Sequence, residues 1–134
     1  MMSNVALLVG SESLSVDEML VHLPEAAWSA ERGTPVSSRR PDGPKRQATL
    51  LRYRSVATGD DVTDHLDSLD PVLRSVELAV SAGVDLSARL TFMVEPRPMG
   101  YQVWIDADDL ARLDRARCGI VMDVYESDEQ DSDQ

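Results

Sequence analysis

Strand-like segments that follow one another without a helix between them constrain the fold of this chain most strongly. Residues 88–94 alternate apolar and polar side chains, and residues 101–105 repeat the alternation after a turn rich in proline and glycine. Residues 27–28 and 48–56 form a second such pair around another proline- and glycine-rich segment. Successive strands of this kind exclude a doubly wound sheet in which every strand is parallel.

Three helical patterns separate these pairs from the first and last strand-like segments, 4–9 and 120–125. Ser15 and Glu18 form a capping box at the start of the first helix, which Pro24 ends. This order of elements predicts an α+β fold. We expect an antiparallel or mixed sheet of about five to six strands, with about three helices packed mainly on one face.

The second helical pattern is the longest and covers residues 62–80. Asp60 and Asp61 are candidates to cap its start, and we expect the helix to restart with Asp70 as a new N-cap. The third helix is expected to begin after Asp106 and to stop at Gly119. The apolar side of the second pattern is expected to form the centre of the core, through Leu69, Leu73 and Val76.

Acidic residues outnumber basic ones by 24 to 13 among the 134 residues, which gives a net charge of −11. The excess lies in residues 59–134, where eighteen residues are acidic and six are basic. A negative potential of this size repels phosphate backbones, so we expect no nucleic acid as a partner. It suits a basic protein partner, or it serves only to keep the chain dissolved.

Several classes of protein are excluded by residue types that the chain lacks. One cysteine, Cys118, and two histidines, His22 and His65, do not suffice for a disulfide framework or a four-cysteine zinc site. We expect no metal and no cofactor. Because no apolar segment has the length of a membrane span and no secretory signal is visible, we expect no membrane contact and a cytoplasmic location.

The chain is expected to form one domain over residues 1–126, followed by an acidic, disordered tail over residues 127–134.

Trp28 and Arg32, followed by Gly33, form the most distinctive local group. Tryptophan and arginine are enriched at binding hot spots, so the group suits a recognition surface. In the alternative interpretation, Trp28 fills a gap between the sheet and a helix. Arg40 and Arg46 lie in the basic loop that follows, which would contact an anionic ligand or remain solvated.

An acidic face is the second candidate interaction surface. Its residues lie along one helix and the segment that leads into it, and they are Asp60, Asp61, Asp64, Asp67 and Asp70. Spacings of three and four residues bring several of these carboxylates close together. A further cluster at Asp106, Asp108 and Asp109 would suit Mg²⁺ or Ca²⁺, but these residues also fit an N-cap and the first turn of a helix.

Several short motifs resemble a known family. They comprise the helix end at residues 22–24 with Trp28 and Gly33, the helices at 64–71 and 106–113, and the strand at 121–125. Together they resemble the bacterial domain of unknown function 4279 family over residues 4–125. That family carries no catalytic residues that can be transferred, so the resemblance implies a fold and not an activity.

These observations lead to two hypotheses about function. The first is a non-enzymatic protein-interaction module, of an immunity-like type, that binds a basic partner such as a toxic nuclease through the acidic face. The alternative is a small-molecule-binding protein or an enzyme with a pocket near Trp28 to Arg54. No motif indicates a catalytic residue, and we interpret Cys118 as a small packing residue.

Overall fold

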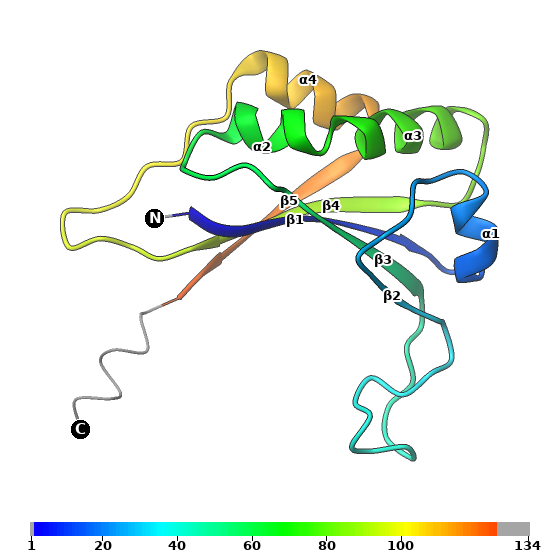
Figure 1. Ribbon diagram of the computed structural model, residues 1–134. Helices are drawn as coiled ribbons and strands as arrows, with labels where there is room; N and C mark the ends of the chain where they lie inside the picture. Colours follow the sequence, from blue (N-terminus) through cyan, green and yellow to red (C-terminus); the bar gives the residue numbers. More distant parts are fainter. Residues whose placement is uncertain (1, 126–134) are drawn as a thin grey trace, which may run out of the picture.

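The computed structural model describes residues 2–125 and confirms the α+β class (Figure 1). The strands are β1 (Met2–Ser11), β2 (Trp28–Ala30), β3 (Thr49–Arg54), β4 (Ser87–Val94) and β5 (Cys118–Val124). The helices are α1 (Val16–Leu20), α2 (Val62–Ser68), α3 (Asp70–Ser81) and α4 (Ala107–Arg115). The tail predicted at residues 127–134 lies outside the described residues.

The five strands form one mixed sheet in the order β2-β3-β1-β4-β5. The pairs β2–β3, β3–β1 and β1–β4 are antiparallel, whereas β4 and β5 are parallel. A parallel pair needs a crossover, and α4 supplies it between β4 and β5. The helical connections from β1 to β2 and from β3 to β4 also join strands that run in the same direction, but in each case one antiparallel strand lies between them in the sheet.

Helices α2, α3 and α4 lie together over one face of the sheet, which we call the helix layer (Figure 1). Leu7, Leu51 and Leu90 face it from the three central strands and are fully buried. The predicted core centre is confirmed, because Leu69, Leu73 and Val76 are 2%, 3% and 0% exposed. Side chains one residue away in each strand point to the opposite side of the sheet, which we call the open face.

Three of the predicted helix starts are confirmed. Ser15 and Glu18 complete a reciprocal capping box, and the carboxylates of Asp61 and Asp106 accept hydrogen bonds from backbone N–H groups in the first turns of α2 and α4. Asp70 does not act as an N-cap. The N-cap of α3 is Leu69, because α2 runs directly into α3, and this leaves the Asp70 carboxylate free to bind arginines.

The strand predicted at residues 101–105 does not form. This segment pairs with no strand, yet its alternation has a physical cause, since Tyr101, Val103 and Ile105 lie half-buried against the core. The helix predicted to reach Gly119 ends at Arg115, because Arg117 adopts a positive φ of 50° and turns the chain. Gly119 and Cys118 therefore belong to β5.

Candidate functional site

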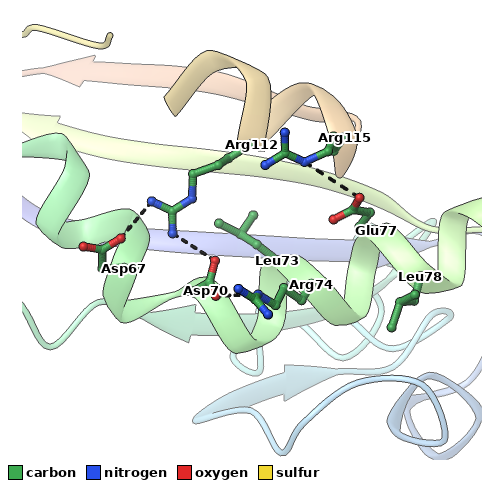
Figure 2. A pocket seen from close by; sticks show the side chains of 8 residues that line it. All are labelled: Asp67, Asp70, Leu73, Arg74, Glu77, Leu78, Arg112 and Arg115. Carbon is green, nitrogen blue, oxygen red and sulfur yellow. Dashed lines mark hydrogen bonds and ion pairs between the residues drawn. The ribbon is translucent and has the colours of Figure 1, made fainter. Parts of the chain in front are cut away.

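A groove of about 750 Å³ lies between α3 and α4 on the outer side of the helix layer (Figure 2). Its walls carry three carboxylates and three guanidinium groups around two leucines. The lining residues are Asp67, Asp70, Leu73, Arg74, Glu77, Leu78, Arg112 and Arg115. Arginines of α4 face carboxylates of α2 and α3, so ion pairs cross the groove.

Arg112 is the central side chain of the groove and joins α4 to the junction of α2 and α3. Its Nη1 lies 2.8 Å from Asp67 Oδ1, and its Nη2 lies 2.9 Å from Asp70 Oδ1 (Figure 2). Burial lowers the pKa of Arg112, but the hydrogen bonds to Asp70 and Asp67 outweigh it and raise that pKa. The Asp70 carboxylate also forms an ion pair with Arg74, whose Nε lies 2.7 Å from Asp70 Oδ2. Arg112 therefore holds the helix layer together and is not available to a ligand.

The predicted acidic residues have separate local roles. The Asp60 carboxylate turns toward β1, where it accepts the Met2 N–H at 2.9 Å, and this hydrogen bond is the main reason that the pKa of Asp60 is lowered. Asp61 caps α2 through the Thr63 N–H. Asp67 and Asp70 are brought together around Arg112. Among residues 2–125, Asp64 is the one residue of the predicted acidic face for which no hydrogen bond or ion pair is found.

Trp28 lies on the open face, where two arginines flank it. The guanidinium carbons of Arg52 and Arg46 lie 4.5 Å and 5.3 Å from the centroid of the tryptophan ring. Trp28 pairs with Arg52 across β2 and β3, and residues opposite each other in a ladder share one face. Trp28 thus remains half-buried on the open face and does not fill a gap between the sheet and a helix, while its role in recognition stays a prediction.

Two further arginines extend this basic region across the open face. Arg54 is aligned with Ala6 on β1, and Arg52 is aligned with Leu8, which is in turn aligned with Arg89 on β4. We call the whole set the arginine surface: Trp28, Arg46, Arg52, Arg54 and Arg89. Within residues 2–125, none of these arginines forms an ion pair with a carboxylate.

The loop between β2 and β3 contributes Arg46 to this surface but not the other predicted arginines. The Gly33 N–H donates to the Arg46 carbonyl, and the Arg46 N–H donates to the Thr34 carbonyl, each at 2.8 Å. These two hydrogen bonds across the loop hold Arg46 at its base. Arg40 lies at the tip, where the Gly43 N–H closes a turn on its carbonyl. Arg32 is exposed and donates to the Glu12 carbonyl. Arg32 and Arg40 therefore lie apart from Trp28.

A hollow of about 610 Å³ lies beside Trp28 at the outer edge of β2. Thr34, Pro35 and Val36 of the loop line it together with Arg46, and α1 adds Val16 and Asp17. Tyr53 secures the approach to β2, because its hydroxyl donates to the Pro24 carbonyl at 2.7 Å. The hollow is open and of mixed polarity, so it suits an extended segment of a partner better than an enclosed small molecule.

Two groups that resemble catalytic chemistry have structural explanations. Ser55 Oγ lies 2.7 Å from His65 Nδ1, and His65 Nε2 lies 2.9 Å from the Gly59 carbonyl. A carbonyl only accepts, so Nε2 carries a proton and donates to Gly59, and in the neutral ring Nδ1 accepts from Ser55. With His65 only 4% exposed, this contact locks the connection from β3 to α2. Burial raises the pKa of the Cys118 thiol to about 11, which keeps it protonated near neutral pH.

The sequence pointed to Trp28 and Arg46 directly and to Arg52 and Arg54 through the alternation of their strand. It missed Arg89 as a member of the same surface. The alternation of residues 88–94 shows that Arg89 lies on the polar side of a strand. It does not show which strands lie beside this one in the sheet. Among residues 2–125, no group of three or more His, Cys, Asp or Glu side chains is arranged to hold a metal ion.

No family model matches the chain, and no curated protein or solved structure was found to be similar to it. The resemblance to the domain of unknown function 4279 family therefore stays a prediction. In the part of the chain that the structure describes, no helix combines the length and the apolar character that crossing a bilayer requires.

Proposed function

We propose that this chain is a non-enzymatic interaction module that binds an acidic segment of a partner protein on its arginine surface. The observation that carries the proposal is that the guanidinium groups of Arg46 and Arg52 both lie over the ring of Trp28 on an open sheet face. Guanidinium groups bind carboxylates through two parallel hydrogen bonds, and stacking on a ring holds them in place for this.

The contrast between the two faces supports this choice of surface. On the helix layer, Asp67 and Asp70 are already bonded to Arg112, so a ligand would have to compete for them. On the open face, Arg52 and Arg54 have no carboxylate partner among residues 2–125. A partner's carboxylates would therefore form new ion pairs without breaking existing ones. A net charge of −11 still disfavours long polyanions such as nucleic acids, so the partner segment is short.

A second candidate keeps the interaction role but uses the helix layer and a basic partner. It is favoured by the charge of the segments that build this layer, residues 60–86 and 95–117, which contain twelve acidic and five basic residues. Such a field accelerates association with a basic protein, as an immunity-like role against a toxin would need. Asp64, which is exposed and has no partner among residues 2–125, would be available to such a protein.

Retention of a partner by two paired variants distinguishes the candidates. The immobilised chain is exposed to a native lysate of its source cells, and each bound protein is identified, purified and rebound. We expect an acidic partner that Arg46→Ala/Arg52→Ala loses and Asp64→Asn/Asp67→Asn retains. A basic partner with the reverse pattern would overturn the proposal in favour of the second candidate, and a copurifying metabolite would favour the small-molecule alternative.

A further inference from the structure

Strand β5 forms one edge of the sheet, and among residues 2–125 no strand pairs with its outer side (Figure 1). Edge strands are commonly shielded by lysine, proline, a bulge or a very short length. β5 has seven residues in unbroken register with β4 and contains neither lysine nor proline. Its apolar side chains are exposed by 37%, 37%, 44% and 66% at Ile120, Val121, Met122 and Val124. β2, at the other edge, has only three residues.

One hydrogen bond shows which backbone N–H and C=O groups of β5 point toward β4 and which point away from it. The Tyr125 N–H donates to the Val94 carbonyl at 3.0 Å, so Tyr125 faces β4. In a parallel ladder, the N–H and C=O of a residue point to the same side, and the side alternates along the strand. The N–H and C=O groups that face away from β4 therefore belong to Cys118, Ile120, Met122 and Val124.

We propose that two copies of this chain associate by antiparallel pairing of their β5 strands about a two-fold axis at Val121. Full overlap of the seven residues places Ile120 opposite Met122 and Cys118 opposite Val124. These are the residues whose backbone groups point outward, so each pair exchanges two hydrogen bonds. The result is one continuous sheet with both helix layers on the same side, formed by a self-complementary interface.

Charge complementarity supports this register. It places Gly119 opposite Asp123 of the second copy, and Gly119 is itself aligned with Arg89 on β4. Arg89 and Asp123 of the second copy are then two strand spacings apart, roughly 10 Å between Cα atoms, with no side chain between them on the open face. Both are exposed, and within residues 2–125 neither has an ion-pair partner.

This contact also accounts for the glycine near the start of an edge strand. Gly119 has no positive φ, and a Cβ added to it would meet no heavy atom within 4 Å. Neither a turn nor close packing within one copy therefore requires glycine there. A side chain at this position would project into the path of Arg89 toward Asp123 of the second copy.

Charge reversal tests the proposal through sedimentation velocity across a range of concentrations. Arg89→Glu alone and Asp123→Arg alone each make both symmetric contacts repulsive, so each variant is expected to dimerise at least tenfold more weakly than the unmodified chain. An equimolar mixture restores opposite charges at both contacts and is expected to form mixed dimers. Asp64→Arg and Arg54→Glu make the same charge changes away from β5 and should leave the dimer intact.

Three results would overturn the proposal. The unmodified chain could sediment as a monomer up to millimolar concentration, or the two single variants could dimerise as it does. Mixed dimers could also fail to form from two variants that circular dichroism finds folded, which would exclude the register about Val121. None of these measurements depends on a partner for the arginine surface, so this proposal and the proposed function can fail separately.

Discussion

At the scale of single residues, the chain uses charge differently on its two faces. Several carboxylates of the helix layer are bonded within the molecule, as Asp70 is to Arg112 and Arg74. Arginines of the open face instead stack on Trp28 or extend into solvent. An ionic side chain that already has a good partner contributes to folding, whereas one without a partner is available for binding.

Asp70 gives a prediction about pH. Burial raises the pKa of Asp70, but the hydrogen bond from Arg112 and the charge of Arg74 outweigh it and lower that pKa below 3.8. Its stabilising effect is therefore present at neutral pH and is lost as the pH falls through the lowered value. Asp70→Asn should reduce the free energy of unfolding by about 1 kcal/mol at pH 7, and this difference should shrink below pH 4.

Urea denaturation of the variant and of the unmodified chain at pH 7 and at pH 3 measures this difference in the free energy of unfolding. Asp64→Asn serves as the control, because Asp64 is exposed and no partner for it is found among residues 2–125. It should change the free energy of unfolding little at either pH. A loss for Asp70→Asn that is equally large at pH 3 would show that its carboxylate is not held by Arg112.

At the scale of helices and strands, α3 is the element that secures the core. Leu73 is 3% exposed on its inner side, whereas Leu78, on its outer side, is 73% exposed. Leu73→Ala should lower the free energy of unfolding by about 2–5 kcal/mol, because it leaves a cavity beneath the helix layer. Leu78→Ala should cost well under half as much in the same chemical denaturation. Equal losses would mean that α3 is rotated relative to the sheet.

The elements that could be predicted from the sequence are those whose burial shows in the periodicity of their own apolar residues. β3 and β4 alternate because one side of each is buried and the other is open, and α3 shows its buried stripe at helical spacing. Residues 101–105 show the same alternation without being a strand, since a loop packed on one side of a core produces it too. Only the ladder partners distinguish the two cases.

At the scale of the whole molecule, strand order creates the proposed site. The alternation of residues 48–56 places Arg52 and Arg54 on one face of a strand, but Arg89 joins them only because β1 lies between β3 and β4. No local pattern contains that information. The same order leaves β5 at the edge, so the arginine surface reaches from Trp28 on β2 to Arg89 on β4, next to the strand through which two copies are proposed to associate.

The emission of Trp28 tests the central claim most directly. The chain contains two tryptophans, so a Trp104→Phe background leaves Trp28 as the single reporter on the arginine surface. Titration with a glutamate-rich peptide should change its emission with saturation. Adding Arg52→Gln should raise the apparent Kd roughly tenfold, whereas adding Arg74→Gln, on the helix layer, should leave it unchanged. An emission that does not respond, or equal weakening by both substitutions, would contradict the account.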